Sequence, residues 1–460
     1  MGFDLQQLLT DRAGENASLY ARSINPQLVR VLRSIGFDRE YVRAEGAYLF
    51  DKDGRRYLDF LSGFGVFGLG RGHPVLKKAL HDVIDADLAS LVQMDAPLLP
   101  GLLAEQLLRR CHGGMGRVFF TNSGSEAIEA ALKFSRYATG RARVLYCSHA
   151  FHGLTFGSLS ANGGSEFRKG FGPLVPGFDE VAFGDAEALE KALASRDVAA
   201  FVIEPIQGKG VNVAPPAYFD AVSELCRRFG TLLVCDEVQT GLGRTGRFWA
   251  HEHYGLVPDL ITTSKALSGG FVPVGAMICS TEVSDKVYSS MERAMVHSST
   301  FKGNALAMVA GLATLQTLDD EDLVDRARLA GDALTKSLEP LVERHDVFHS
   351  VRGKGLMVGL VFGEPARGHG RTRFRLLEAA HKGLFSQLVV GPLFHRHGIL
   401  TQVAGDHMNV VKLLPPLISS DEDLEYFIES LDDVLGDAHR SGLLVEFGTT
   451  LAKATLRRDR

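Results

Sequence analysis

The sequence predicts an α/β protein: a large domain built on a wound, mainly parallel sheet flanked by helices, plus a smaller α+β domain. Three observations support this prediction. Short apolar runs alternate with amphipathic helical stretches from about residue 75 to 325, as in sheets whose parallel strands are joined by helices. The chain has 460 residues, which is enough for more than one compact unit. Its hydrophobic content of 45% and charged content of 23% are typical of a globular protein.

The elements follow in order along the chain. Residues 1–40 form a polar, partly helical start, and residues 46–61 alternate around Asp53-Gly54 in the manner of a hairpin. The strands expected in the large domain are Val118–Thr121, Val144–Cys147, Ala200–Ile203, Leu232–Cys235, Leu260–Thr263 and Ala276–Ser280. These runs are rich in β-branched and apolar residues, as buried strands are.

The second domain follows from a change of pattern near residue 320. Asp320–His345 has helical periodicity, Gly353–Phe362 and Val410–Leu414 are expected to be strands, and a last amphipathic helix starts at Ser420-Asp421 and ends near Leu435. We therefore divide the chain into an N-terminal segment (1–75) that contributes to the small domain, a large domain (76–325), a C-terminal small domain (326–440) and a tail (441–460).

Charge and cysteine content exclude several classes of function. The net charge of −5 and the pI near 6.4 provide no basic surface for nucleic acid or anionic lipid. Five widely spaced cysteines indicate neither a disulfide framework nor a CxxC zinc site, and we expect no metal. No signal peptide and no membrane-spanning run is recognisable at the sequence level, so we expect a cytoplasmic protein.

The first polar group follows the strand that ends at Thr121. Ser123 and Glu126 have the spacing of a capping box, in front of a helix over Ala127–Tyr137 that Gly140 closes. A well-capped helix is one interpretation. The other is that the backbone N–H groups of Gly124 and Ser125, at the positive end of this helix, bind a phosphate.

Three further strands end in residues that carry chemistry. His149-Ala150-Phe151-His152 follows the second strand, where a core aromatic beside a satisfied histidine is the simpler interpretation. Glu204 and Asp236 each end an apolar strand, and an unpaired buried carboxylate is costly, so metal ligation, acid–base work or a cationic partner is expected unless they belong to a solvated loop. Lys265 lies beside a Gly pair, where desolvation would make it nucleophilic. Together these groups suggest pyridoxal 5′-phosphate (PLP).

The motifs containing these residues also occur together in a known family. FTNSGSEAIEAALKFSR, HAFHG, EPIQGKG, DEVQTGLGRTG, ITTSKALSGG and HSSTFKGN appear in this order. The chain from about Gly46 to about Leu435 thus resembles the class III (omega) aminotransferases, which are PLP enzymes of fold type I. The resemblance implies a small α+β domain built from both chain ends.

The resemblance also implies roles at the cofactor. Lys265 would hold PLP as a Schiff base and move the proton during the reaction, while Asp236 would pair with the ring nitrogen. The remaining cofactor-binding residues would surround the ring and its phosphate, namely Phe151, His152, Val238, Gln239, Ser123, Gly124, Ser125 and Thr300. In this scheme Val238 and Phe151 pack on opposite ring faces, and Gln239 reaches the phenolic oxygen. Thr300 would complete the phosphate site across the interface of a homodimer.

The residues expected near the substrate depart from those that are common in this family. The resemblance places Gly65, Val66, Phe67 and Glu204 near the substrate. Lys412 stands where many relatives have an arginine that grips a substrate carboxylate, and an ammonium lacks the planar fork of a guanidinium. Lys412, Arg71 or another group would then hold the acceptor's carboxylate, unless Lys412 is a solvated strand residue.

We therefore expect a ping-pong aminotransferase that moves an amino group between a terminal amine (a diamine, an omega-amino acid or a larger amine metabolite) and a keto acid or aldehyde. An aminomutase or racemase on the same scaffold is the alternative. A dinucleotide-binding oxidoreductase would use the glycines of 241–246, but these follow an acidic strand end without the strand-to-helix context of that fingerprint.

Overall fold

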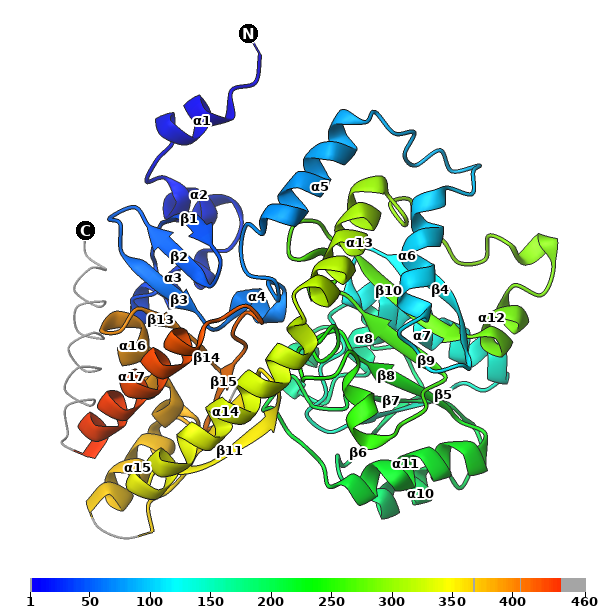
Figure 1. Ribbon diagram of the computed structural model, residues 1–460. Coiled ribbons are helices and arrows are strands. Elements are labelled where there is room, and N and C mark those ends of the chain that lie inside the picture. Colours follow the sequence, from blue (N-terminus) through cyan, green and yellow to red (C-terminus); the bar gives the residue numbers. More distant parts are fainter. Residues whose placement is uncertain (1, 367–368, 406, 440–460) are drawn as a thin grey trace.

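The computed structural model describes residues 2–366, 369–405 and 407–439. The described strands form one seven-stranded sheet and two four-stranded sheets. In Figure 1 the large sheet and its helices lie on one side of the molecule, and the small sheets lie on the other. The predicted α/β class with a mainly parallel sheet and a separate small α+β part is confirmed.

The strands belong to these three sheets. Their bounds are β1 Tyr41–Glu45, β2 Tyr48–Asp51, β3 Arg56–Asp59, β4 Met115–Thr121, β5 Arg143–Cys147, β6 Phe178–Val181, β7 Val198–Ile203, β8 Leu232–Asp236, β9 Leu260–Thr263, β10 Gly275–Ser280, β11 Phe348–Lys354, β12 Met357–Phe362, β13 Ile399–Leu400, β14 Gln402–Val403 and β15 Val410–Leu413. All six strands expected in the large domain are present, each within a few residues of its predicted bounds.

The helices lie between and around the strands. Their bounds are α1 Leu5–Asp11, α2 Asn16–Ser23, α3 Pro26–Ile35, α4 Ser62–Gly65, α5 Pro74–Asp85, α6 Leu98–Leu108, α7 Gly124–Thr139, α8 Phe156–Ser160, α9 Ser165–Arg168, α10 Ala186–Leu193, α11 Pro216–Phe229, α12 Thr281–Val287, α13 Ala305–Asp320, α14 Leu323–Arg344, α15 His369–Ala380, α16 Leu384–His395 and α17 Asp421–His439, with single 3₁₀ turns η1 Ala250–Tyr254, η2 Lys265–Ser268 and η3 Met291–Arg293.

The seven-stranded sheet runs in the order β4-β10-β9-β8-β7-β5-β6. Its pairings are parallel except for the two that β10 makes with β4 and β9. Strand β7 is buried on both faces, and its side chains alternate between two cores. Val202 packs in a cluster with Ile128 of α7, whereas Phe201 packs in a cluster with Phe219 of α11. Helices on both faces therefore bury this sheet, which explains its nearly continuous apolar strands.

The two small sheets share one core that combines both ends of the chain. They run in the orders β1-β2-β3-β13 and β11-β12-β15-β14. Phe60, just after β3, packs in the same buried cluster as Leu338, Val411 and Phe427. The parallel pairing of β3 with β13 joins the two ends directly, with Leu58 opposite Ile399. The hairpin predicted around Asp53-Gly54 is confirmed as β2–β3.

Two element predictions are wrong in detail. Gly353–Phe362 is not one strand, because the chain reverses at Gly355, which has a φ of +52°, and forms the hairpin β11–β12. Asp320–His345 is not one helix, because α13 ends at Asp320 and α14 begins after Asp322, which has a left-handed φ of +48°. Strand β6 and the two-residue strands β13 and β14 were not predicted at all.

The predicted domain boundaries stay a prediction, and the tail at 441–460 lies outside the described residues. In the part of the chain that the structure describes, none of the helices combines the length and the apolar character needed to cross a membrane. The same residues contain no cluster of three or more metal-ligating side chains.

The packing of α14 against the hairpin β11–β12 gives a testable prediction. A Cβ on Gly331, inside α14, would overlap the backbone of Gly355, which cannot move away as a flexible side chain could. We expect Gly331→Ala to destabilise the protein by about 1–3 kcal/mol, measured as a lower midpoint in urea unfolding. Gly101→Ala, in α6, is the matched control because nothing lies within 4 Å of its added Cβ. A midpoint that Gly331→Ala leaves unchanged would contradict this close approach.

Candidate active site

The predicted site residues gather at one edge of the seven-stranded sheet. Strands β5, β7, β8 and β9 are parallel, and β4 runs the same way because both β4 and β9 are antiparallel to β10. The residues at their carboxyl ends are Ser123 after β4, Phe151 and His152 after β5, Glu204 after β7, Asp236 at the end of β8 and Lys265 after β9. This edge is where ligands bind in open α/β sheets.

Asp236 is buried and held by three partners. Its Oδ2 lies 2.7 Å from His152 Nδ1, and its Oδ1 accepts hydrogen bonds from the Val238 backbone N–H at 3.0 Å and from the Thr262 hydroxyl at 3.2 Å. Burial lowers the pKa of His152, but the hydrogen bond and charge of Asp236 outweigh burial and raise it. Asp236 and His152 therefore form a buried, charge-assisted pair.

The second ring nitrogen of His152, Nε2, is not used in the contact with Asp236. Its backbone N–H donates to Asn162 Oδ1 at 2.7 Å, which fixes the loop after β5. The Nε2 atom is buried and has no hydrogen-bond partner among the described residues. A buried polar atom of this kind requires an explanation, and a bound group at this edge of the sheet would supply one.

Lys265 combines an unusual backbone with an unusual side-chain environment. Its φ of +44° is in the left-handed region, which is uncommon for any residue except glycine and concentrates at functional sites. Burial lowers the pKa of the Lys265 ammonium, while the negative charges of Asp236 and Glu204 act in the opposite direction. The outcome is an amine that loses its proton more readily than an ordinary lysine, as a nucleophile must.

The N-terminus of α7 forms an open end beside these groups. Ser123 caps the helix by accepting a hydrogen bond from the Glu126 backbone N–H at 3.2 Å. The predicted capping box is incomplete, because the Glu126 carboxylate reaches the Asn122 N–H at 2.7 Å and not that of Ser123. The helix begins at Gly124, three residues earlier than predicted, and Gly140 ends it as expected.

The first two N–H groups of α7 remain available. In the described part of the chain, neither Gly124 N–H nor Ser125 N–H has a hydrogen-bond partner. A Cβ on Gly124 would come within 2.9 Å of Val238 Cγ1, so the backbone of α7 closely approaches the loop after Asp236. This positive helix end is suited to an anion.

Phe151 and Glu204 are joined through the backbone. Glu204 Oε1 accepts a hydrogen bond from the Phe151 N–H at 3.0 Å, and Oε2 accepts one from the Gly208 N–H at 2.7 Å. Burial raises the pKa of the Glu204 carboxyl group, against the charge of His152. The ring of Phe151 contacts Phe167 edge to face at 5.2 Å between centroids.

Lys412 is not a solvated strand residue. It lies in the middle of β15, is 5% exposed, and donates hydrogen bonds to Gly208 O at 2.8 Å and to Gln239 Oε1 at 3.2 Å. Gln239 in turn donates from Nε2 to Phe64 O at 2.9 Å. The structure therefore brings Lys412 and Gln239 together at the edge that carries Glu204.

Residues 65–67 lie next to this group. Gly65 ends the short helix α4, close to Gln239. The ring of Phe67, just beyond Val66, stacks under the Arg71 guanidinium at 3.9 Å. Arg71 also pairs with the buried carboxylate of Asp59 at 2.8–2.9 Å, so it is already engaged within the protein.

Thr300 lies apart from the strand ends. It is exposed, and its carbonyl oxygen accepts a hydrogen bond from Gln93 Nε2 at 3.1 Å. The preceding residue, Ser299, accepts a hydrogen bond from Asn122 Nδ2 at 2.8 Å, which places this segment beside the start of α7.

Three contributors were not singled out in the sequence. Thr262 precedes the lysine by three residues within an apolar strand, Asn162 lies in an irregular loop, and Gly208 lies in a Gly-rich turn. A Cβ at Gly208 would meet Gln239 Oε1 at 2.7 Å and Glu204 Oε2 at 3.1 Å, so a larger residue there would displace one of these side chains. Of these three residues, only Thr262 could have been suggested by the sequence, because its hydroxyl lies near the end of a strand.

Comparison with known proteins identifies what this arrangement resembles. The family model "Aminotransferase class-III" matches residues 34–435. The acetylornithine aminotransferase of Bacillus anthracis is 36% identical over 399 residues, which are 86% of this chain and 94% of that protein. The aminotransferase PigE of a Serratia species is 35% identical over 447 residues, but the chain spans only 52% of its length.

Solved structures agree with this match. The ornithine aminotransferase of Toxoplasma gondii has a TM-score of 0.80 at 28% identity, over 96% of this chain and 99% of that one. An amine transaminase from an uncultivated Pseudomonas species, in its PLP-bound form, has a TM-score of 0.77 at 30% identity, over 87% and 95% of the two chains.

Proposed function

The chain belongs to the class-III aminotransferases, which depend on PLP, and from that premise we propose that it transfers an amino group between a terminal amine and a keto acid or aldehyde in two successive half-reactions. The observation that carries the proposal is the pairing of a buried Asp236–His152 couple with Lys265, whose amine has a lowered pKa, at one edge of the sheet. These are the two groups that PLP chemistry needs, an acid for the ring nitrogen and a nucleophilic lysine.

The residues at this edge fit PLP. The free N–H groups of Gly124 and Ser125 suit its phosphate, and the absence of a Cβ on Gly124 leaves the helix end against Val238. Asp236 would pair with the pyridine nitrogen, and Lys265 would react with the aldehyde. When bound, PLP supplies an aldehyde that takes up the amino group and a ring that accepts electrons from the substrate carbon.

The chain's own groups then have separate tasks. Lys265 would form the covalent link to the cofactor and, once released by the substrate amine, move a proton to and from the substrate carbon. Asp236, stabilised by His152, would keep a proton on the ring nitrogen by its negative charge. Phe151 and Val238 would hold the ring from its two faces, and Glu204 would border the substrate.

A single-substrate experiment tests the reaction type. The purified holoenzyme, mixed with one reactive amine and no keto acid, should release about one equivalent of carbonyl product per site and then stop. Addition of a keto acid should restart product formation. An aminomutase or racemase would retain the nitrogen on one molecule and continue, so turnover without an acceptor would contradict the proposal.

The assignment of Lys265 is tested by mapping. We expect borohydride reduction of the holoenzyme to place the pyridoxyl group on Lys265, and Lys265→Ala to abolish sustained transamination, because burial lowers the pKa of this amine and it follows β9 at the edge that carries Asp236. Lys286→Ala is a control, since Lys286 is an exposed lysine of α12 that pairs with Glu282. A pyridoxyl group on another lysine would refute the assignment.

A terminal amine is proposed as substrate because of Lys412. A guanidinium grips an α-carboxylate with two parallel hydrogen bonds, which an ammonium cannot reproduce. Lys412 is buried and already donates to two carbonyl oxygens, while Arg71 pairs with Asp59. Neither cation is therefore free to hold the α-carboxylate of an amino donor, which favours donors whose amine is remote from a carboxylate.

Selectivity can be measured directly. We expect kcat/KM for a diamine to exceed that for an α-amino acid of similar length, and Lys412→Arg to shift the ratio toward the α-amino acid by about tenfold, the value of one charge-assisted hydrogen bond. Arg326→Lys is a comparison variant, because the Arg326 guanidinium donates to the backbone oxygens of Ile418 and Ser419 and is not among the proposed site residues. A wild type that prefers the α-amino acid would refute the terminal-amine proposal.

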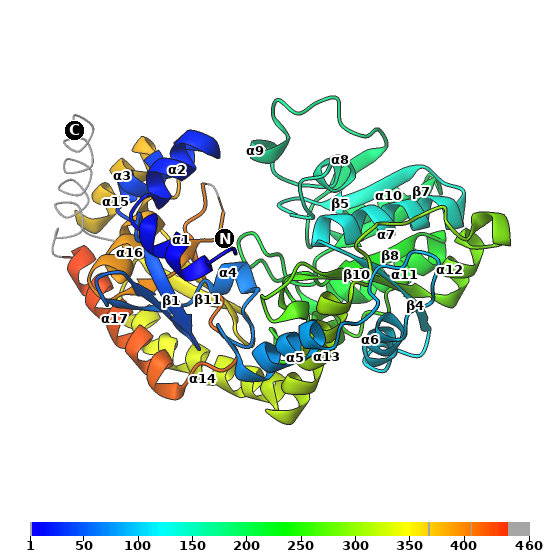
Figure 2. The same ribbon diagram turned by 90° about the horizontal axis from the view of Figure 1, so that it is seen from above.

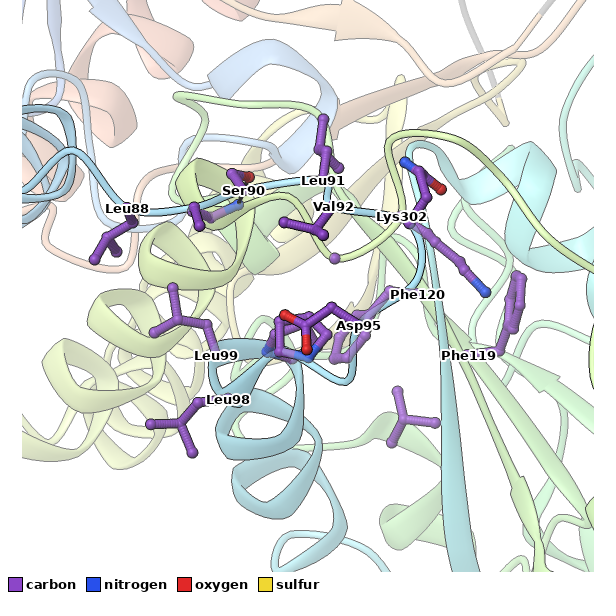
Figure 3. Close-up of a pocket in the computed structure, with 17 residues that line it drawn as sticks. Leu88, Ser90, Leu91, Val92, Asp95, Leu98, Leu99, Phe119, Phe120 and Lys302 are labelled. Carbon is purple, nitrogen blue, oxygen red and sulfur yellow. Dashed lines mark hydrogen bonds between the residues drawn. The ribbon is translucent and has the colours of Figure 1, made fainter.

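We further propose a homodimer. Large apolar side chains remain exposed on the two segments beside Thr300, namely Met94 at 93%, Leu98 at 73%, Met291 at 96%, Met295 at 68% and Phe301 at 60%. A cavity of about 550 Å³ lies in the same region, lined by residues of 88–100 and by Lys302. Figure 3 shows the side chains that line it. Exposed apolar surface of this extent favours a protein partner, and a second copy would bring Thr300 to a phosphate site.

Sedimentation tests this arrangement. We expect the active, PLP-saturated enzyme to sediment as a dimer or larger species, and Phe301→Asp to shift it toward an inactive monomer by placing a charge in an apolar interface. Val257→Asp is the matched control. Val257 is also an exposed apolar residue, at 63%, but it precedes β9 and so lies at the amino ends of the parallel strands, opposite the ends that carry the proposed site. An active monomer at assay concentration would refute the shared site.

A further inference from the structure

The side chain of Lys412 has an unusual set of partners for a buried cation. Lys412 occupies the third position of β15, between β12 and β14, in a four-residue strand that is buried throughout. Its Nζ donates to two neutral oxygens, Gly208 O and Gln239 Oε1. Among the described residues, no carboxylate lies within ion-pair distance of Nζ, whereas buried charges are normally paired.

The number of partners matches a neutral amine. An ammonium has three N–H donors, but a neutral amine has two, and two acceptors are present. Burial lowers the pKa of Lys412 to about 7, with a second lowering effect from the charge of Lys265 and an opposing effect from Glu204. Lys412 can therefore satisfy both oxygens without a stable positive charge.

Lys412 determines how the Gln239 amide is oriented. An amide can rotate so that its oxygen and nitrogen exchange places, and the surrounding network decides which orientation holds. Phe64 O can only accept, and a Lys412 amine whose two N–H groups are directed at Gly208 and Gln239 donates to the atom that it faces. Gln239 Oε1 must then face Lys412 and Nε2 must face the Phe64 side. The opposite orientation would place two donors together and two acceptors together.

The same lysine joins both sides of the site into one hydrogen-bonded chain. Gly208 offers its carbonyl oxygen to Lys412 and its N–H to Glu204, which also accepts from the Phe151 N–H. The chain thus runs from Phe151 through Glu204, Gly208, Lys412 and Gln239 to Phe64. Its middle is tightly packed, because a Cβ on Gly208 would meet Gln239 Oε1 at 2.7 Å.

We propose that Lys412 is a positioning residue, which fixes the Gln239 amide with its nitrogen available to the cofactor's ring oxygen, and that it does not bind a substrate carboxylate. The inference rests on the proposed function in that Gln239 is expected to contact PLP. It goes further in assigning to this position a structural hydrogen-bond role in place of a charge. Lys412 acts through Gln239 and does not itself touch the reacting atoms.

The test uses the holoenzyme and reads the bound cofactor without turnover. Lys412→Met keeps the length of the side chain but removes its donors. We expect the pH midpoint of the cofactor's absorption band to shift and PLP affinity to fall by about fivefold to tenfold, in the same direction as in Gln239→Leu. The double variant should add little to either single variant, because both remove the same contact.

Kinetics and matched variants separate positioning from substrate binding. A positioning role lowers kcat for every substrate pair, whereas a carboxylate grip raises KM for the keto acid and leaves the absorption band unchanged. Lys412→Arg, which keeps N–H donors, should retain the wild-type midpoint. Lys209→Met is the charge control, since Lys209 lies next to Gly208 but pairs with Glu166.

Three results of these experiments would count against the positioning role of Lys412 or against the proposed function. An unchanged band and affinity in Lys412→Met, or additive effects in the double variant, would overturn the proposal. If Lys412→Met does not fold, Lys412→Arg and Gln239→Leu decide it: a midpoint shifted equally by both would count against the donor role. A wild type that binds PLP but performs no transamination would refute the proposed function alone, because the spectral comparison needs no turnover.

Discussion

The cost of burying a carboxylate is the constraint on which the site depends. Asp236 ends an apolar strand inside the protein, where an ionised group without partners would be strongly destabilising. Its partners come from the loop after β5, from β9 and from its own backbone turn. These elements must keep their order and register for the three contacts to form. The site therefore forms only when the mainly parallel sheet of Figure 1 has assembled with its native strand order and register.

The fold was predictable wherever burial imposes a period on the sequence. Strand β7 is apolar throughout because helices cover both of its faces, and such runs are recognisable without a structure. Strand β6, FDEV, is half exposed, and β13 and β14 have two residues each, so these strands exist only through pairing with distant partners. The hairpin β11–β12 was missed because its turn depends on the left-handed backbone of Gly355.

The site was predictable where its residues follow strands, and not where distant segments meet. Asp236, Glu204 and Lys265 could be located from strand ends and motifs alone. The hydrogen bonds of His152 with Asp236 and of Lys412 with Gln239 join segments with no shared local pattern. The burial of Lys412 was equally hidden, because a lone lysine in a strand is usually solvated. Only the position of β15 between two other strands determines it.

The shared core of the two chain ends has a consequence for biosynthesis. Strands β1 to β3 leave the ribosome well before α14, α16, β15 and α17, whose residues belong to the cluster that buries Phe60. Figure 2 shows the N-terminal strand β1 beside elements coloured yellow to red, which come much later in the sequence. Domains generally fold as units during synthesis. Strands β1 to β3 therefore cannot complete their core until α14, α16, β15 and α17 have been synthesised. A prematurely terminated product would leave that apolar surface uncovered, as a recognition signal for chaperones and proteases.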